Sequence, residues 1–340
     1  MATSWWGEAG HMDLEQPTLA YDIPAAGVGY MEDDAKADPQ AQADQIDRFV
    51  ADGASVIIVN PGVESAYLPA VQRAIKAGVP VIALFQPILH ARTLYVAFDP
   101  VEQGRQEARA LLAVKPRGTY AVIKGDPSTT PESDMIAAGI EEILQPAVDR
   151  GDVKIVASVD THWWQADVAK QEMATILSQN GGSVDAVVVE SDGMASGVAE
   201  AIEEAGLTGK VAVAAGGSYS SWDGLVNVLK GRQTVEVWGN LERTAHGIVE
   251  AAIALCRDPG ITNVAGSVSV TWPGGDPMQA ILLAPVAITK DNIGIVIQSG
   301  PTWRRWICGD ATFTPDFAPP ACQTGPVPTP SSSASGTVSG

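Results

Sequence analysis

The chain has 340 residues, of which 46% are hydrophobic, so it has enough apolar material for two sizeable cores and two domains are expected. Its 21 Lys and Arg residues stand against 40 Asp and Glu residues, which leaves a formal net charge of -19. A charge of that sign and size repels phosphate backbones and anionic lipid surfaces, which argues against nucleic acid or a membrane surface as a partner.

Short apolar runs alternate with amphipathic segments along most of the chain. The runs are continuously apolar, as is typical of parallel strands covered on both faces. Asp99 and Pro100 supply a capping carboxylate and a first-turn proline at one helix start. We therefore predict an α/β fold with parallel sheets and right-handed crossovers. The expected strands are Ser55–Asn60, Val79–Leu84, Leu94–Phe98, Thr119–Ile123, Val153–Ser158, Ala186–Glu190, Val211–Ala215 and Thr234–Val237. The expected helices are Gln40–Asp52, Ser65–Ala77, Pro100–Val114, Gln165–Gln179 and Ala195–Ala205.

The cysteines and the end of the chain indicate the compartment. Cys308 and Cys322 bracket a proline-rich loop, a poor place for a packed free thiol, so we expect a disulfide and an oxidising environment. Cys256 lies in an Ala-rich helix and is read as a small core residue. Residues 323–340 are rich in Pro, Ser and Gly and are expected to be a disordered tail or linker.

No apolar stretch reaches the roughly 18 to 20 residues that a membrane-spanning helix needs. The longest ones, such as Ala280–Ile288, read as core strands. The start, Met1–Trp6, lacks the basic and apolar regions of a signal peptide. A mature segment that begins at an added Met has this form, so we expect an extracytoplasmic protein, secreted or membrane-anchored, whose N-terminal signal has been removed.

From about Asp38 to Ile307 an ordered set of segments resembles the type I periplasmic binding proteins, in particular the sugar-binding branch that includes the xylose-binding proteins. Each segment is short, but their order is maintained over most of the chain. The segments are Gln42–Ile46 with Gly53–Val59, Ala74–Ile82, Lys124–Pro127, Asp185–Gly193, Gly209–Val213 and Gly231–Thr234.

The resemblance implies two Rossmann-like lobes joined by a three-segment hinge, with crossovers near Phe98, Val237 and Pro277. The N-lobe is then residues 1–98 plus 238–277, and the C-lobe is residues 99–237 plus 278–322. The ligand is expected between the lobes, at the carboxyl ends of parallel strands. The first strand departs from the family's apolar run, since only Ala2–Trp6 is available. Either this strand is unusual, or residues before Met1 are missing.

The expected site also departs from the sugar-binding pattern, in which Asp, Arg, Asn and Lys side chains bind hydroxyls. At the family's polar positions this chain has Phe85 and Gln86, Thr130 and Pro131, Ser191 and Asp192, Gly217, and Trp238 and Gly239; only Asp192 and Trp164 match the family. Near the cleft this chain has tryptophans where relatives have polar side chains. Their indole rings offer flat apolar faces that also attract cations. Glu190, Asp192 and Glu236 supply hydrogen-bond acceptors or a counter-charge.

About half of the tryptophans near the cleft are expected to be core or interface residues, whereas Trp164 and Trp238 are the two principal candidates for ligand contact. Trp272, Trp303 and Trp306 are expected to pack near the third crossover. His11 and His162 are expected near the cleft as hydrogen-bond partners, and His246 is expected within a helix as a structural or solvated residue. The expected ligand-binding residues are Trp6, His11, Phe85, Gln86, Thr130, Trp163, Trp164, Glu190, Asp192, Gly217 and Trp238.

The sequence is compared with three function classes: a solute-binding protein, a ligand-sensing domain and an enzyme. An enzyme is disfavoured because the sequence has no GxSxG, GxxxxGK[ST] or GxGxxG motif, and Gly216–Ser220 reads as a tight strand-to-helix turn. A ligand-sensing domain for a signalling partner stays an alternative, and a hydrolase-type enzyme a weaker one. We predict a monomeric solute-binding protein of an ABC importer that closes on one small molecule, without cofactor or metal, and docks on a membrane permease. The ligand is expected to be a sugar or a modified, less hydroxylated solute, aromatic or cationic.

Overall fold

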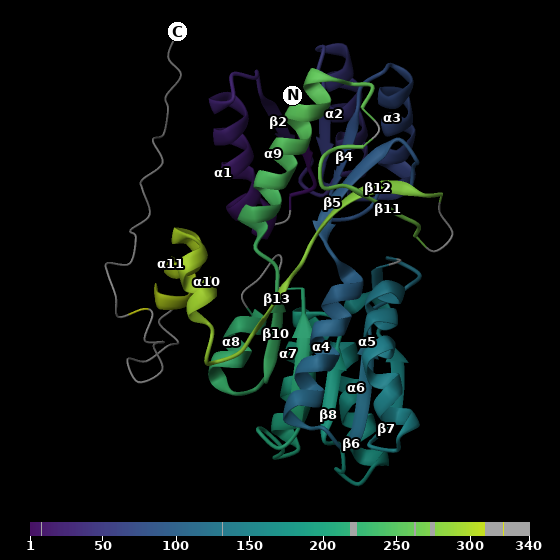
Figure 1. Ribbon diagram of the computed structural model, residues 1–340, viewed down its shortest axis with the longest axis vertical. Coiled ribbons are helices and arrows are strands. Elements are labelled where there is room, and N and C mark those ends of the chain that lie inside the picture. Colours follow the sequence, from purple (N-terminus) through teal and green to yellow (C-terminus); the bar gives the residue numbers. More distant parts are fainter. Residues whose placement is uncertain are drawn as a thin grey trace.

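The computed structural model describes residues 1–7, 9–130, 132–217, 223–261, 263–272, 276–309 and 322. Two sheets, each covered by helices on both faces, form two lobes that several chain segments connect (Figure 1). The predicted α/β class with two lobes of mainly parallel strands is confirmed. We call the part built on the seven-stranded sheet the N-lobe and the part built on the six-stranded sheet the C-lobe.

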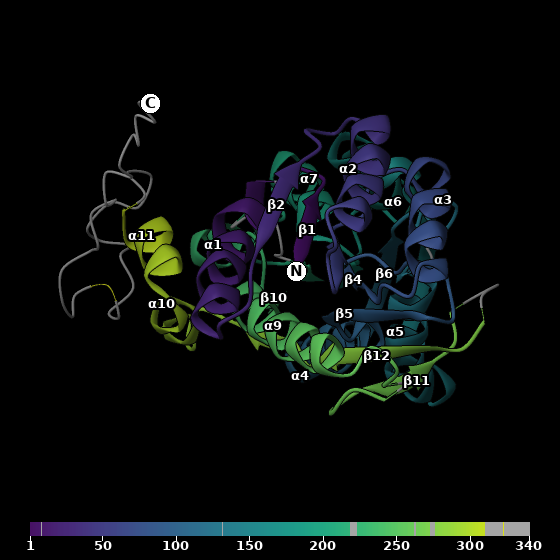
Figure 2. The same cartoon turned by 90° about the horizontal axis from the view of Figure 1, so that it is seen from above.

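The N-lobe sheet is parallel except for one antiparallel pair at its edge, β11 with β12. Helices α2 and α3 pack on one face, and α1 and α9 on the other; Figure 2 shows α1 and α2 on opposite sides of β1. In spatial order the strands are β11 (Val268–Val270), β12 (Met278–Leu283), β5 (Thr93–Phe98), β4 (Val81–Leu84), β3 (Ile57–Val59), β1 (Ala2–Trp5) and β2 (Met31–Asp34). The helices are α1 (Ala9–Ala25), α2 (Pro39–Ala51), α3 (Glu64–Lys76) and α9 (Leu241–Arg257).

The C-lobe sheet is parallel except for its edge strand β13, which pairs antiparallel with β10. Helices α4 and α5 cover one face, and α6 and α7 cover the other. In spatial order the strands are β13 (Val286–Ile288), β10 (Val235–Trp238), β9 (Ala212–Gly216), β8 (Ala186–Val189), β6 (Gly118–Lys124) and β7 (Val153–Asp160). The helices are α4 (Pro100–Val114), α5 (Glu132–Asp149), the 3-10 turn η1 (His162–Trp164), α6 (Ala166–Gln179), α7 (Asp192–Glu204) and α8 (Asp223–Lys230).

Local chemistry explains several of these element boundaries. The Asp99 carboxylate accepts hydrogen bonds from the backbone N–H groups of Val101 and Glu102, which starts α4 as predicted. Gly53 and Gly78 follow α2 and α3 with φ of 79° and 83°, the left-handed conformation that ends a helix most easily at glycine.

The unusual first strand, β1, lies inside the N-lobe sheet between β3 and β2. It buries two hydroxyl groups, and each has a partner: Ser4 Oγ donates to Gln45 Oε1 at 2.7 Å, and Tyr30 Oη donates to Thr3 Oγ1 at 3.0 Å. Buried hydroxyls are tolerated when they are hydrogen-bonded, so a strand with little apolar character can occupy this place.

The chain passes between the sheets three times: after β5, after β10, and between β12 and β13. The third passage was expected near Pro277, but β12 pairs in parallel with β5 up to Leu283, and so it belongs to the N-lobe sheet. Only β13 joins the C-lobe sheet. The predicted core run Ala280–Ile288 is therefore two strands in different lobes, separated by Pro285, which has no N–H to donate to a sheet.

Helices α10 (Gly294–Ser299) and α11 (Pro301–Gly309) lie beside the connection between the lobes (Figure 1). They contribute to one apolar cluster that also contains Leu14 of the N-lobe, Leu225 of the C-lobe, Trp238 and Trp303. The predicted disulfide between Cys308 and Cys322 is present, with a Cα–Cα distance of 5.4 Å. Cys256 lies on α9 and packs against an N-lobe core, as expected. The predicted tail, 323–340, lies outside the described residues.

Candidate ligand-binding site

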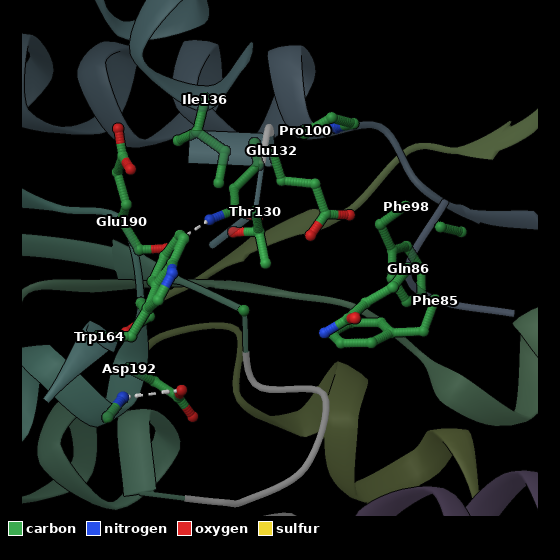
Figure 3. A pocket seen from close by; sticks show the side chains of 15 residues that line it. Phe85, Gln86, Phe98, Pro100, Thr130, Glu132, Ile136, Trp164, Glu190 and Asp192 are labelled. Carbon is green, nitrogen blue, oxygen red and sulfur yellow. Dashed lines mark hydrogen bonds between the residues drawn. The ribbon is translucent and has the colours of Figure 1, made fainter. Parts of the chain in front are cut away.

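The strand ends of the two lobes face each other across a cavity of about 330 Å³. The N-lobe contributes residues that end β5 or follow β4, and the C-lobe contributes residues from α4, α5, α7 and the ends of β7, β8 and β9. In Figure 3 Trp164 and Asp192 lie on one side, Phe85, Gln86 and Phe98 lie on the other, and the Glu132 side chain reaches between them. The lining residues are Phe85, Gln86, Ala97, Phe98, Pro100, Gln103, Thr130, Glu132, Ile136, Trp164, Glu190, Ser191, Asp192, Gly193 and Gly217.

The structure brings most of the predicted site residues together and leaves four of them off the cavity wall. Those that line the cavity are Phe85, Gln86, Thr130, Trp164, Glu190, Asp192 and Gly217. Those that do not line it are Trp6, His11, Trp163 and Trp238. Pro131, which follows Thr130 in the expected site, lies outside the described residues.

Trp238, one of the two principal candidates, is only 3% exposed and lies at the end of β10. Its ring packs edge-on against Trp303, with 5.4 Å between ring centroids. Its side chain thus belongs to the apolar cluster beside the lobe connection. The sequence could not indicate this because Trp303 lies on α11, a helix far along the chain.

The other three residues surround the site without lining it. Trp6 packs over Gly62, where an added Cβ would lie 2.1 Å from the indole ring. His11 is fully buried, bonded to Glu15, and its ring lies 4.8 Å from that of Phe85. Trp163 is 61% exposed next to Trp164.

Trp164 is held by an unusual turn. Trp163 and Trp164 both have left-handed φ, 55° and 56°, which is a strained conformation for residues with a Cβ. The Asp126 carboxylate accepts a hydrogen bond from the backbone N–H of Trp163 at 3.0 Å. Hydrogen bonds from Ser128 and from this backbone group lower the pKa of Asp126 to about 2. The Trp164 ring lies over Gly125, where a Cβ would come within 2.1 Å of it, so the glycine makes room for the indole.

Two carboxyl groups of the lining, those of Glu190 and Glu132, have a pKa raised well above the ordinary value. Burial raises the pKa of Glu190 to about 7, although Ser133 Oγ and the Gly125 N–H both donate to its Oε2, at 2.6 and 2.7 Å. Burial also raises the pKa of Glu132 to about 7, opposed by its hydrogen bond with Tyr95. Each group therefore changes its charge close to neutral pH.

Further acids lie directly behind the wall. Gln103 Nε2 donates to Glu107 Oε1 at 2.9 Å and to the Glu190 carbonyl oxygen at 3.1 Å. Glu107 is fully buried, and burial raises its pKa well above the ordinary value, with further contributions from Glu190 and Glu236. Glu236 is also fully buried and accepts from Gln233 Nε2 at 2.6 Å.

A hydrogen bond joins the two lobes inside the cleft. The hydroxyl of Tyr95, on β5, lies 2.7 Å from Glu132 Oε1 on α5 and 2.7 Å from the carbonyl oxygen of Phe85. A phenol has one hydrogen to donate. When Glu132 is protonated, its carboxyl group donates to Tyr95, which in turn donates to Phe85; when Glu132 is ionised, Tyr95 is drawn to the carboxylate.

Glu132 and Phe98 are the main lining residues that sequence reasoning missed. Phe98 was predicted as a strand end, and the end of a parallel strand is itself the signal for a site. Glu132 lies in the first turn of α5, a helix that was not among the predicted elements. Among the described residues no group of three His, Cys, Asp or Glu side chains could hold a metal ion, and none of the helices there is long and apolar enough to cross a membrane.

Comparisons with known proteins agree with this geometry. Residues 24–258 match a family model described as a periplasmic binding protein domain. The chain is 30% identical over 268 residues to the D-xylose-binding periplasmic protein of Haemophilus influenzae, covering 78% of this chain and 79% of the relative. It is 29% identical over 276 residues to a xylitol-binding protein of Mycolicibacterium smegmatis, covering 80% and 71%. A solved structure described as a periplasmic ribose ABC transporter from Conexibacter woesei superposes with a TM-score of 0.73 at 20% identity, covering 89% of this chain and 95% of that one.

Proposed function

Since the chain belongs to the periplasmic binding protein family, whose members bind solutes, we propose that it is the solute-binding component of an ABC importer and holds one polyhydroxylated molecule in the cavity between its lobes. The observation that carries the proposal is the cavity itself. It lies at the carboxyl ends of parallel strands, it is lined from both lobes, and it combines aromatic faces with hydrogen-bonding groups.

The size and the lining of the cavity support a ligand the size of one sugar. A volume of about 330 Å³ lies at the lower end of the range of small-molecule pockets, about 300 to 1,000 Å³. Relatives are named for xylose and xylitol, so pentoses, pentitols and their derivatives are the first ligands to test. The proposed contacts are Phe85, Gln86, Thr130, Trp164, Glu190, Asp192 and Gly217 from the sequence, with Phe98 and Glu132 added from the structure.

The proposed mechanism is selection of the closed state. The ligand bridges the walls and shifts the equilibrium between open and closed lobes by its greater affinity for the closed one. The closed monomer then docks on its permease at the outer face of the cytoplasmic membrane. The protein binds its solute and releases it unchanged.

A thermal-shift screen tests the proposal, with sugars, polyols, nucleosides and amines as probes. A ligand that binds only the folded protein stabilises it by about 2.7 kcal/mol at 100 times its Kd, so a true ligand raises Tm. Trp164→Ala should reduce the shift, and Tyr21→Ala, which truncates an aromatic side chain that is 75% exposed on α1, should preserve it. If no polyhydroxylated compound raises Tm, or if Trp164→Ala responds as the unaltered protein does, the proposal is wrong.

A further inference from the structure

All the charged residues that line the cavity are acidic. They are Glu132, Glu190 and Asp192, and none of the fifteen lining residues is Lys, Arg or His. Glu107 and Glu236 add two buried carboxyl groups just behind the C-lobe wall. Carboxyl groups are rarely gathered away from water unless a cation or hydrogen-bond donors compensate them.

The compensation inside the protein is incomplete. Glu190 Oε1 and Thr130 Oγ1 are buried without a hydrogen-bond partner in the part of the chain that the structure describes. Glu190 is 1% exposed, and both groups that donate to its other oxygen, the Gly125 N–H and the Ser133 hydroxyl, are neutral. Lys124 lowers the pKa of Glu190 from a distance, but its ammonium group forms an ion pair with Asp160 at 2.5 Å.

Glu132 is the carboxyl group best placed to meet a ligand. Figure 3 shows its side chain extending into the space between Trp164 on one wall and Phe85 and Phe98 on the other. Its partner, the Tyr95 hydroxyl, is neutral and occupies Oε1. Aromatic faces around a carboxylate form the environment that proteins use to hold an ammonium group.

The hydrogen-bond donors and acceptors of the lining also favour a ligand that carries an ammonium group. A neutral sugar hydroxyl both donates and accepts, so a site for a neutral sugar needs donors as well as acceptors. The side-chain donors left in the lining are the Gln86 amide and the Thr130 and Ser191 hydroxyls, because the Gln103 amide already donates to Glu107 and Glu190 and the Trp164 indole donates to Thr129. An ammonium group carries three donors and no acceptor, which matches an acceptor-rich lining.

We propose that the solute carries a protonated amine beside its hydroxyl groups, and that this ammonium group lies between the Glu132 carboxylate and the rings of Phe85, Phe98 and Trp164. This inference rests on the proposed solute-binding function and narrows its substrate class to amino sugars and amino polyols. The remaining carboxyl groups, Glu190 and Asp192, then accept hydrogen bonds from the hydroxyl groups of the same molecule.

Calorimetric titration with matched probes tests the proposal. The pairs are xylitol against 1-amino-1-deoxyxylitol and glucose against glucosamine, with N-acetylglucosamine as a probe that carries the nitrogen without the charge. At a pH where the amine is protonated, each amine should bind at least about tenfold more tightly than its neutral partner, because a desolvated cation is attracted by aromatic faces and by a carboxylate. The acetylated probe should not show the gain.

Glu132→Gln and Glu132→Asp form the matched pair of variants. Gln keeps an oxygen that accepts from Tyr95 and removes the charge, so the preference for the amine should fall about tenfold or more. Asp keeps the charge and should keep a preference for the amine. The Tm of each variant without ligand reports whether it is folded.

The results separate the two levels of the proposal. If the neutral probes bind as tightly as the amines, or if Glu132→Gln folds and keeps the full preference for the amine, the amine inference is overturned and the solute-binding function stands. If neither member of any pair binds, the solute-binding function for polyhydroxylated molecules fails as well.

Discussion

The two walls of the cavity differ in chemistry. The N-lobe wall consists of Phe85, Gln86, Ala97 and Phe98, with a single polar side chain. The C-lobe wall carries Trp164, every ionisable group of the lining, and the two lining atoms, Thr130 Oγ1 and Glu190 Oε1, that are buried without a hydrogen-bond partner among the described residues. We therefore propose that the C-lobe wall binds the polar groups of the solute and that the N-lobe wall covers the solute and excludes water.

This difference predicts an order of events. A ligand that meets the open protein gains most of its hydrogen bonds on the C-lobe, and closure of the N-lobe adds apolar contact and strengthens the electrostatic interactions by removing water. Variants of the two walls should consequently affect different properties. The following predictions run from the largest expected effect to the smallest.

The largest effect is expected at Trp238, in the apolar cluster beside the lobe connection. Trp238→Ala removes a buried ring from the cluster that joins α1, α8 and α11, and so it should lower the free energy of unfolding by about 3 to 5 kcal/mol. Chemical denaturation measures the change. Trp163→Ala, which truncates a ring that is 61% exposed, should change stability by less than about 0.5 kcal/mol. Equal losses in the two variants would show that Trp238 is not part of a packed core.

The second effect concerns pH and the acids of the C-lobe wall. Burial raises the pKa of Glu190 to about 7 from its ordinary 4.5, so between these values the folded state holds a proton that the unfolded state releases. Stability should consequently be highest below about pH 5 and fall as the pH rises through 7, by about 3 kcal/mol for this group. Glu132 acts in the same direction. Lys124 opposes the shift, and Asp160 adds to it.

Glu190→Gln should flatten this part of the pH profile, because the amide keeps an acceptor for Ser133 and Gly125 but has no proton to lose. Urea denaturation from pH 5 to 8 measures the slope. Glu64→Gln, on the exposed start of α3, is the control and should leave the slope as it is. A Glu190→Gln profile that is as steep as that of the unaltered protein would contradict the assignment.

The third effect compares the walls directly. Trp164→Ala should weaken ligand binding by about 1 to 3 kcal/mol, whereas Phe85→Leu, which keeps apolar bulk on the N-lobe wall, should weaken it by less than about 1 kcal/mol. Isothermal titration with the ligand found in the screen provides both values. A greater loss for Phe85→Leu than for Trp164→Ala would reverse the roles assigned to the lobes.

The smallest effect is expected at the hydrogen bond between Tyr95 of the N-lobe and Glu132 of the C-lobe. Tyr95→Phe removes the hydroxyl that joins β5 to Glu132, and one such hydrogen bond contributes about 0.5 to 1.5 kcal/mol. Small-angle scattering without ligand should then show a larger population of open protein. A distribution unchanged from that of the unaltered protein would mean that this bond does not hold the lobes together.

Much of the fold could be predicted because it follows from local pattern. Apolar runs such as Val81–Leu84 and Ala186–Val189 are continuous, their neighbours are amphipathic, and both form buried parallel strands. The third passage between the lobes was misplaced because Ala280–Ile288 looks like one apolar run. Its only interruption signal is Pro285, and which sheet each half joins is decided by pairing with strands far away in the chain.

The cavity lining was predicted only in part, because some of its residues are positioned by packing between segments far apart in the chain. Residues that follow strands, such as Phe85 and Asp192, could be placed at the cleft from the strand order alone. Glu132 could not, because it lies at a helix start and faces the cleft only through the packing of α5 against α4. Trp238 is also at a strand end, but the sequence does not show that α11 packs against it.

The position of β12 has a consequence for how the chain is made. The C-lobe is almost continuous from α4 to β10, so it can begin to fold on the ribosome as soon as that stretch has emerged. The N-lobe sheet, in contrast, waits for β12 to pair with β5 across a separation of some 180 residues, as between Leu94 and Gln279. Such long-range pairing is slow. Translation therefore leaves one edge of β5 unpaired until after the stretch from α4 to β10 has been synthesised, and an unpaired strand edge is a template for pairing with other chains.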